Sequence, residues 1–362
     1  MGTYRIAVLP GDGIGPEVIT EGLKVLDALE RAVPDLRLEC REYPAGAACY
    51  LSAKDPLPLE TLEACRQADA IFLGAMGDPR IRMPDGTEVT PQITLRFLLD
   101  LYAGVRPIKM YPNVRGPLRC QDPGSIDLVL IRENVEGFFA STHSGILVGD
   151  QVATDTIVIT RRGTERAVRF AFELCRRRKG IPLTGERVVT CVDKANVFRS
   201  YAFFRKVFDE VTTEFPDIHS NHVYVDAMAL YLVQRPGDFD VIVAENLFGD
   251  ILSDLGAGLV GGLGMAPSAD IGDRHAVFQP AHGSAPDIAG QGMANPLAAI
   301  LSASMMLDWL GQRYQDSAAS KAAELLEHAV VQVLKEGRVK TRDLGGKAST
   351  AQVGDAVATY LC

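Results

Sequence analysis

Two aspartates four residues apart, in the segment "AENLFGDILSDLGAG", are the clearest candidates for a metal site in the sequence. Asp250 and Asp254 have a spacing that places both carboxylates on one face of the helix we expect here. Like charges at this spacing repel each other, and the neighbouring Ile251, Leu252 and Leu255 would leave them incompletely solvated. A divalent cation would relieve the repulsion, and carboxylate ligands favour Mg²⁺ or Mn²⁺. An isolated acidic pair is more often simply solvated, so that interpretation stays open.

Three arginines are candidates for binding a substrate with more than one carboxylate. Arg96 falls within a helix that we expect to begin near Thr90 and Pro91, while Arg106 and Arg132 each follow the end of an expected element. Singly, each would most often form a surface ion pair. Together they could enclose carboxylates, because the planar guanidinium fork matches carboxylate geometry.

A lysine that follows an expected strand is a candidate general base. Lys194 stands in "VDKANV", directly after a run of mainly apolar residues. Beside a metal ion its pKa would fall, and it could then accept the proton of a substrate hydroxyl. A lysine at the end of a strand more often has no role beyond solvation, and this interpretation also stays open.

The glycine-rich segment "LPGDGIGPEV" near the start of the chain does not have the spacing of a dinucleotide-binding fingerprint. That fingerprint requires GxGxxG, whereas Gly11, Gly13 and Gly15 alternate and are followed by Pro16. Proline suits the first turn of a helix, so the segment also fits an ordinary strand-to-helix turn. A cofactor, if one binds, must be held mainly by other residues.

A long loop of small residues, residues 279–296 ("QPAHGSAPDIAGQGMANP"), is a second candidate for cofactor contact. Small side chains let backbone amides approach phosphates. Asp287 within the loop could hold a ribose diol while repelling a 2′-phosphate. On spacing alone this signal is weak.

The elements that would position these residues alternate along the chain. Short β-branched runs predict strands at residues 5–9, 70–74, 127–133, 156–160, 187–194, 222–227 and 240–246. Amphipathic patterns predict helices at residues 17–30, 92–103, 165–178, 201–215 and 295–310. The alternation predicts an α/β fold with a largely parallel sheet, and the polar residues after four of the strands predict a polar cleft at its edge. Segments rich in proline and glycine, residues 104–118 and 256–272, are candidate crossings between domains.

Composition bounds the function further. The 362 residues suffice for roughly two domains, and the 47% hydrophobic content allows substantial cores. A formal net charge of -9 argues against nucleic acid as a partner. The seven cysteines form no CxxC pair, which argues against a zinc site and a disulfide framework. No apolar stretch approaches the ~20 residues that span a bilayer, so we expect no membrane contact. The first expected strand begins without a preceding leader, so we expect a cytoplasmic protein.

Several motifs occur in the order, and at about the spacing, seen in one enzyme family: "LPGDGIGPEV", "VRP", "RENVEG", "VDKANV", "YVDAMA", "GDILSD" and "HGSAPDIAG" followed by "ANP". On these motifs, which span nearly the whole chain, the sequence resembles the β-decarboxylating dehydrogenases, the family of isocitrate, isopropylmalate, homoisocitrate and tartrate/D-malate dehydrogenases. The resemblance implies an isopropylmalate/isocitrate dehydrogenase-like α/β fold, in which two α/β domains share a large twisted mixed sheet with a cleft between them. It also implies a homodimer, with residues 1–103 and 259–362 on the cofactor side and residues 104–258 carrying the substrate, the metal and the dimer contact.

The resemblance also assigns roles to the candidate residues. It implies NAD-dependent, Mg²⁺- or Mn²⁺-dependent oxidative decarboxylation of a malate-type 2-hydroxy di- or tricarboxylate to a 2-oxo acid and CO₂. The catalytic residues would be Lys194 and Asp226, and both would be supplied by the other subunit. Asp226 would also be a metal ligand, together with Asp250 and Asp254. The substrate-binding residues would be Arg96, Arg106, Arg132, Thr90 and Gln92. The cofactor-binding residues would be Ile14, His282, Gly283, Ser284, Ala285, Asp287 and Asn295.

Two departures from the family pattern leave the substrate and the activity open. The family commonly has a tyrosine seven residues after the arginine of "REN", where Phe139 stands here. A phenyl ring cannot donate a proton to an enolate, so His143 is a candidate donor. The segment before Arg96 lacks the leucines that receive an isopropyl group, and Thr90 and Gln92 resemble residues that face the third carboxylate of isocitrate. The alternative function is a non-catalytic regulatory paralogue within a heteromeric dehydrogenase.

Overall fold

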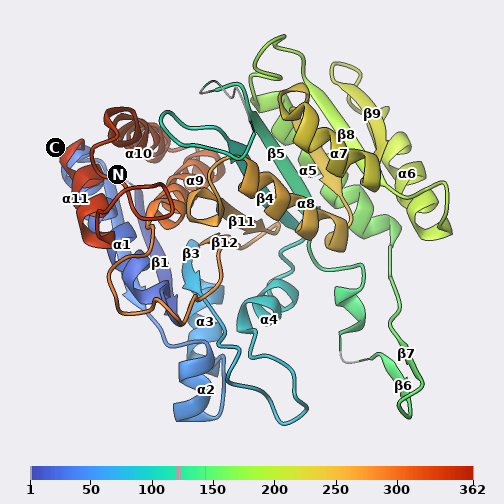
Figure 1. Ribbon diagram of the computed structural model, residues 1–362, viewed down its shortest axis with the longest axis horizontal. Coiled ribbons are helices and arrows are strands. Elements are labelled where there is room, and N and C mark those ends of the chain that lie inside the picture. The colour runs from blue at the N-terminus through green and yellow to red at the C-terminus, as the bar shows by residue number, and fades with distance from the viewer. Residues whose placement is uncertain (1, 119–121, 123, 143, 362) are drawn as a thin grey trace. The chain divides into compact units, whose positions relative to one another are not determined.

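The computed structural model describes residues 2–118, 122, 124–142 and 144–361, and it confirms the α/β class (Figure 1). The chain divides into two compact units. Unit 1 comprises the residues up to Asp100, Tyr111–Arg115 and the residues from Gly261, and unit 2 comprises Leu101–Met110 and Gly116–Val260. His143, the candidate proton donor, lies outside the described residues. No helix in the described part of the chain is long and apolar enough to cross a membrane.

Unit 1 contains five strands in the order β2-β1-β3-β12-β11. Their bounds are β1 Gly2–Gly11, β2 Leu36–Glu42, β3 Ala70–Ala75, β11 Pro267–Ile271 and β12 Ala276–Pro280. The first four strands in this order pair in parallel, and only β11 and β12 pair antiparallel. The central strand β3 is buried along its whole length, as its continuous apolar sequence predicts.

The helices of unit 1 pack in two layers on its sheet. They are α1 Gly15–Ala32, α2 Ala47–Ala53, α3 Leu59–Gln67, α4 Pro91–Leu98, α9 Leu297–Tyr314, α10 Ser317–Glu336 and α11 Thr350–Thr359. Helices α1 and α9 contact the strands, while α10 packs on α9 and α11 packs on α1. Pro16 lies in the first turn of α1, as the sequence predicted. The chain thus leaves β1 through the glycine-rich turn directly into a helix.

Unit 2 contains five strands in the order β4-β5-β10-β8-β9. Their bounds are β4 Ala103–Lys109, β5 Asp127–Glu133, β8 Val188–Asp193, β9 His219–Tyr224 and β10 Val241–Ala244. Strand β4 runs antiparallel to β5, and the remaining pairs are parallel. A separate antiparallel hairpin consists of β6 Ile146–Val148 and β7 Val152–Thr154. The parallel pairs place the carboxyl ends of β5, β8 and β10 at one edge of the sheet.

Four α-helices and a short 3₁₀ turn complete the part of unit 2 that bears on function. They are α5 Arg161–Arg177, α6 Arg199–Thr212, α7 Val225–Gln234, α8 Asn246–Leu259 and the turn Phe139–Ser141. Leu130, Ile242 and Val192 from the strands form a core with Leu232 of α7 and Leu252 of α8. Helix α5 contacts β5, β8 and β10, and helix α6 contacts β8 and α5.

Three of the predicted elements are wrong or displaced. Residues 156–160 form no strand, because Val158 makes only an isolated bridge to Gly137 and Thr160 caps α5 by accepting a hydrogen bond from the Gly163 N–H. The predicted helix 92–103 ends at Leu98, and β4 begins at Ala103. The predicted strand 222–227 ends at Tyr224, so Asp226 lies in the first turn of α7.

Candidate functional site

The glycine-rich turn of unit 1 is built around a buried aspartate. Asp12 accepts backbone hydrogen bonds from Ala47, Ala48 and Gly77 at 2.7, 2.9 and 2.8 Å. A carboxylate that accepts three N–H groups fixes the turn without any ligand. This geometry explains why the turn need not match a dinucleotide fingerprint.

The same turn fastens the long loop of small residues. The Ile14 N–H donates to the Ser284 carbonyl at 2.8 Å, and Gly13 has a φ of +59°. A Cβ at Gly13 would lie 1.9 Å from the Ser284 oxygen, so only glycine permits this approach. Ile14 and Ser284, both predicted cofactor contacts, are therefore neighbours in unit 1.

The remaining predicted cofactor residues follow along this loop. His282 has an Nδ1 2.9 Å from the Gly283 carbonyl, and burial lowers the pKa of its imidazole. Its Nε2 is buried and has no hydrogen-bond partner within the described part of the chain. Ala285 has a positive φ, and Asp287 is exposed. Asn295 at the loop's end is buried and donates to Asp343 at 2.9 Å.

Helix α4 carries the three predicted substrate contacts of unit 1. Arg96 is buried, and its Nε donates to Asp270 at 2.9 Å, where Gln279 also donates. Gln92 lies one turn before Arg96 on the same helix face, and Thr90 is the N-cap residue. The Gln92 Oε1 is buried without a partner among the described residues. A buried carboxamide oxygen without a partner is costly, so this position suits contact with a polar group.

Arg132 is the centre of the candidate site in unit 2. Its side chain is 3% exposed, its Nε donates to Asn246 Oδ1 at 2.8 Å, and its Nη1 pairs with Asp250. The Phe139 ring lies over the guanidinium with 5.0 Å from the carbon Cζ to the ring centroid. The phenyl ring therefore offers its face to the cation but no hydroxyl.

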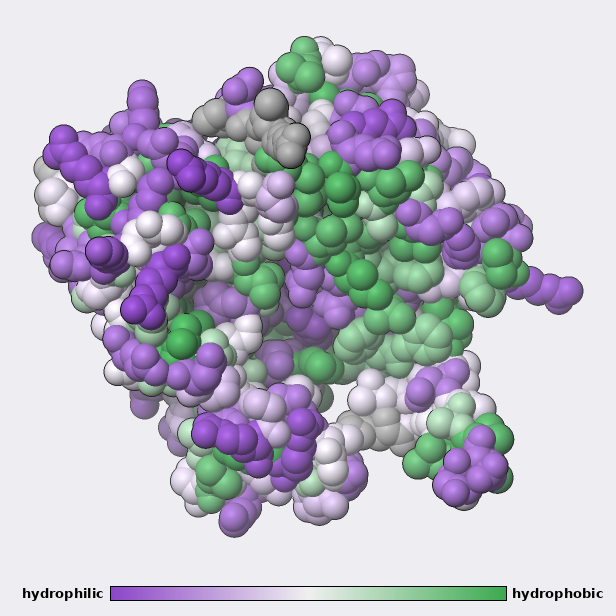
Figure 2. Space-filling view, viewed as in Figure 1, coloured by the Kyte–Doolittle hydropathy of each residue, from purple (hydrophilic) through white to green (hydrophobic). Residues whose placement is uncertain are grey.

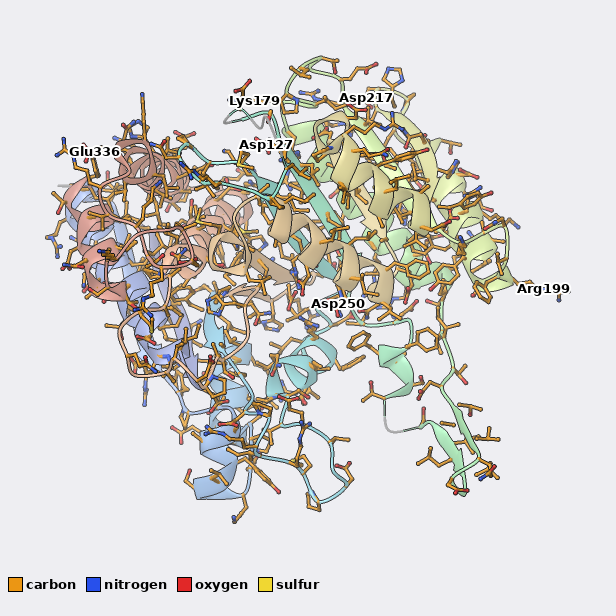
Figure 3. The ribbon with its side chains drawn as sticks, in the orientation of Figure 1. Asp127, Lys179, Arg199, Asp217, Asp250 and Glu336 are labelled. Atoms are coloured by element: carbon orange, nitrogen blue, oxygen red, sulfur yellow. The ribbon has the colours of Figure 1, made fainter. Side chains whose placement is uncertain are left out.

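The acidic pair lies on α8 as the spacing predicted. Asp250 projects from the first turns of α8 (Figure 3), and Asp254 follows one turn later. Burial, followed by the charge of Asp250, raises the pKa of Asp254, while Arg106 and Arg132 act in the opposite direction. The two arginines thus only partly compensate the acidic face. An oxygen-only donor set with residual negative charge fits a divalent cation such as Mg²⁺ or Mn²⁺.

Lys194 and Asp226 form an ion pair within one chain. Asp193 fixes the turn that carries the lysine, because it accepts hydrogen bonds from the Ala195 N–H at 2.8 Å and from Arg205 at 2.7 and 2.8 Å. Asp226 is exposed, and its hydrogen bond with Lys194 lowers the pKa of its carboxyl. Within the described residues of this single chain, no group of three His, Cys, Asp or Glu residues could hold a metal ion. Asp226 therefore does not join Asp250 and Asp254 in one chain, and its role as third ligand stays a prediction.

Several supporting residues had no role in the sequence interpretation. Asp270 holds Arg96, Asp343 holds Asn295, and Tyr201 donates to the buried Glu245 at 3.0 Å. A charged residue within the apolar run "APSADIG" was the available signal for Asp270. Tyr201 and Asp343 had no comparable signal, because their partners are distant in the sequence.

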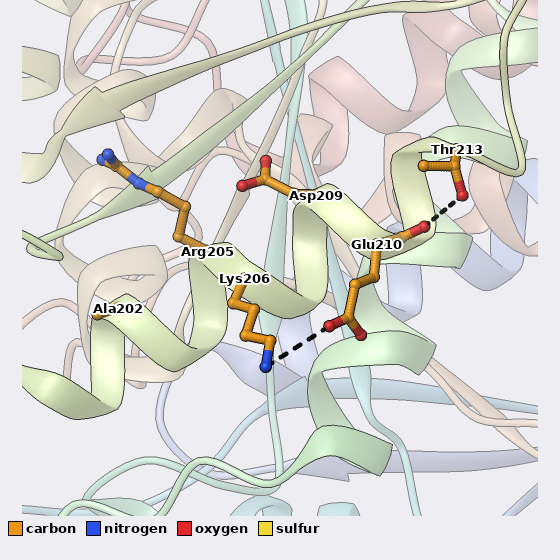
Figure 4. Close-up of a pocket in the computed structure, with 6 residues that line it drawn as sticks. All are labelled: Ala202, Arg205, Lys206, Asp209, Glu210 and Thr213. Atoms are coloured by element: carbon orange, nitrogen blue, oxygen red, sulfur yellow. Dashed lines mark hydrogen bonds and ion pairs between the residues drawn. The ribbon is translucent and has the colours of Figure 1, made fainter.

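A surface pocket in unit 2 lies along α6 (Figure 4). Its lining residues all belong to α6 or its C-terminal cap: Ala202, Arg205, Lys206, Asp209, Glu210 and Thr213. Lys206 pairs with Glu210 at 4.0 Å, and Thr213 donates to the Glu210 carbonyl at 2.7 Å. The other charged pairs reach beyond α6: Arg205 pairs with Asp193, Asp209 with His222 and Glu210 with Arg161. Because these groups are occupied by protein partners, we assign the pocket no role in the candidate site.

Comparison with known proteins identifies the family. A family model described as isocitrate/isopropylmalate dehydrogenase matches residues 5–357. A 3-isopropylmalate/3-methylmalate dehydrogenase of Methanocaldococcus jannaschii is 43% identical over 356 residues, which cover 98% of each chain. A 3-isopropylmalate dehydrogenase of Aquifex aeolicus is 40% identical over 100% of this chain and 98% of its own. The crystal structure of isocitrate dehydrogenase from Methylococcus capsulatus aligns with a TM-score of 0.85 at 36% identity and covers 99% of both chains.

The chain therefore belongs to the isocitrate/isopropylmalate dehydrogenase family. This result confirms the family resemblance on which the residue roles depend. The fold is of the isopropylmalate/isocitrate dehydrogenase type, as the motifs implied.

Glu133 gives a prediction about stability. It is 2% exposed, and burial raises the pKa of its carboxyl to about 7. The folded chain thus binds this proton more tightly than the unfolded chain, so the stabilisation is fully present below about pH 4.5 and is lost as pH rises through about 7. The unfolding free energy of the wild type should therefore fall between pH 4.5 and 8. In urea unfolding, Glu133→Gln should make this fall smaller by up to about 3 kcal/mol.

The control for this prediction is Glu324→Gln, on the exposed face of α10. It should leave the pH dependence of unfolding unchanged. A difference between the wild type and Glu133→Gln that stays constant from pH 4.5 to 8 would contradict the account of Glu133.

Proposed function

We propose that this protein catalyses the NAD-dependent, Mg²⁺- or Mn²⁺-dependent oxidative decarboxylation of a 3-substituted malate to a 2-oxo acid and CO₂. The observation that carries the proposal is the cluster in unit 2 where buried Arg132 meets the acidic face of α8. Cationic forks and carboxylates of this kind suit a substrate that presents both carboxylates and a hydroxyl. In this proposal residues 1–103 and 259–362 bind the cofactor, and residues 104–258 bind the substrate and the metal.

The chain's own residues would bind the substrate and move its proton. Arg106 and Arg132 hold and orient the carboxylates of the malate core, joined by Arg96 from α4. Lys194 Nζ would accept the proton of the 2-hydroxyl while the hydride at C2 passes to NAD. Asp226, Asp250 and Asp254 would hold a divalent cation, which when bound supplies Lewis-acid stabilisation of negative charge on oxygen. The resulting β-keto acid would lose CO₂, and the enolate that remains would take a proton from solvent or from a donor other than Phe139 to give the 2-oxo acid.

The cofactor preference rests on the loop that follows β12. The Ile14 amide bonds the loop backbone at Ser284, Asp343 accepts from the side chain of Asn295, and Asp287 is exposed on the loop. A carboxylate accepts hydrogen bonds from ribose hydroxyls but repels a 2′-phosphate. NAD is therefore the proposed cofactor, with NADP disfavoured.

The proposed partner is a second copy of the chain. Large apolar side chains are exposed on α7 and α8 and on the β6–β7 hairpin: Leu230, Val233, Ile251, Ile146, Leu147, Val148 and Val152. Figure 2 shows an apolar patch over α7 and α8. Asp226 lies on the same helix α7, so association through this surface would bring the Lys194–Asp226 pair to the interface.

The cellular location that we propose is the cytoplasm. The five cysteines that the structure describes are free thiols, four of them buried. Free thiols suit a reducing compartment.

The proposed function is tested by turnover of the purified chain. With NAD and Mg²⁺, at least one of isopropylmalate, isocitrate, homoisocitrate, tartrate or D-malate should produce NADH and CO₂, and excess EDTA should abolish the rate. We expect kcat/KM with NAD to exceed that with NADP by at least about tenfold. Binding without turnover for every substrate would favour the regulatory alternative, and turnover that persists in EDTA would refute the metal-dependent mechanism.

Gln92 gives a prediction about the C3 substituent. Its buried, unpartnered carboxamide oxygen should favour a polar substituent over a branched alkyl group. Gln92→Leu should therefore shift the kcat/KM ratio of isopropylmalate to isocitrate by about tenfold toward isopropylmalate. Thr94→Val, on the exposed face of α4, is the matched control and should not change the ratio. An unchanged ratio in Gln92→Leu would remove Gln92 from substituent recognition.

The shared active site gives a complementation test. Chains with Lys194→Ala and chains with Asp250→Asn should each be inactive, because each lacks one required group. Refolded together, half of the dimers are mixed and one of their two sites is whole, so roughly a quarter of wild-type activity should return. A mixture of Asp250→Asn and Asp254→Asn chains should recover nothing. Failure of the first mixture to recover activity would contradict sites shared between subunits.

A further inference from the structure

The position of Arg132 is set by the way α8 starts after β10. Arg132 lies near the end of β5 and pairs in register with Ala244, the last residue of β10. Helix α8 begins two residues later, so its first turn passes directly over the arginine. A Cβ at Gly249 would lie 2.8 Å from the Arg132 Cβ, so glycine is needed for this close approach.

Asn246, the first residue of α8, is bonded at both ends of its carboxamide. Its Oδ1 accepts from Arg132 Nε at 2.8 Å, and its Nδ2 donates to the Glu136 carbonyl at 2.9 Å. A cationic donor faces one end and a carbonyl acceptor faces the other, so both neighbours require the same amide orientation. The side chain is fully buried, which excludes water as a substitute partner.

The far side of this connection is also anchored. The Glu136 side chain accepts from the Thr160 N–H at 2.8 Å and from the Thr160 hydroxyl. Thr160 is in turn the N-cap residue of α5. The guanidinium of Arg132 is thus connected through Asn246 and Glu136 to the start of α5.

We propose that Asn246 is a positioning residue: it fixes the Nε edge of Arg132 so that the opposite Nη edge faces the substrate carboxylate. The inference rests on the proposed function, because it requires that Arg132 bind a substrate carboxylate. Charge-assisted hydrogen bonds to a planar guanidinium restrict its rotation. Without Asn246, Arg132 keeps its charge and its contact with Asp250 but loses the bond that orients the fork.

The test combines a binding measurement, kinetics and a spectroscopic readout in Asn246→Ala. The probe is (R)-malate, which carries both carboxylates and the hydroxyl but no C3 substituent. Titrated calorimetrically with Mg²⁺ present and NAD absent, the variant should bind (R)-malate roughly 10-fold to 100-fold more weakly, the range for a hydrogen bond to a charged group. The KM for substrate should rise by a similar factor while the KM for NAD stays unchanged. In ¹⁵N spectra of the ligand-free chain, the Arg132 Nε–H proton should exchange faster with water.

The matched control is Thr160→Ala, which removes the cap of α5 at the far end of the same connection. It should lower the melting temperature about as much as Asn246→Ala while leaving the Kd for (R)-malate and the Arg132 exchange rate unchanged. If both variants weakened binding equally, or if Asn246→Ala left the Kd and the exchange rate at wild-type values, the positioning role would be overturned. If the wild-type chain neither bound (R)-malate nor turned over any substrate, the proposed function itself would fail.

Discussion

The buried charge of Arg132 is the constraint on which the candidate site depends. A guanidinium that is 3% exposed is costly unless each edge is hydrogen-bonded or paired. Three groups surround it: Asn246, Asp250 and the Phe139 ring. The first two lie in the first turns of α8, directly after β10, and Phe139 lies in the 3₁₀ turn that follows β5. Movement of the first turn of α8 would therefore break both the hydrogen bond with Asn246 and the ion pair with Asp250.

The buried acids beside Arg132 obey the same physical logic. Glu245 caps α8 by accepting the N–H of Leu247 at 3.2 Å, and Glu133 accepts the N–H groups of Val135 and Glu136 at 3.0 and 2.8 Å. Each carboxyl group thus satisfies a backbone turn, and the charge of Arg132 acts on Glu245. In unit 1, Asp12 and Asp270 act alike, one on a turn and the other on Arg96. These acidic groups are required by the fold before any substrate binds.

The sequence predicted the parts of this structure that depend on local pattern. The i,i+4 spacing of Asp250 and Asp254 on one helix was visible, as was the proline at the start of α1. The segment 104–118 does cross between the units, but strand β4 at its start was not predicted, because Pro107 and the surrounding glycine and proline concealed an antiparallel strand. The Asp270–Arg96 and Tyr201–Glu245 contacts could not be predicted, since each joins residues that only the tertiary fold brings together. Family resemblance named the arginines but neither Asp270, which holds Arg96, nor Asn246, which holds Arg132.

The ion pair of Lys194 with Asp226 supports the proposal that two chains share the site. Lys194 is paired with a carboxylate that stands on α7, apart from the acidic face of α8. Leu230 and Val233 on the same helix expose apolar surface that water solvates poorly, so α7 favours burial against another surface. Burial of that face would also dry the surroundings of the lysine, where a lower dielectric strengthens its interactions with nearby carboxylates. The apolar surface that favours association is thus carried by the same helix as the charged pair, so assembly and catalysis would depend on one element.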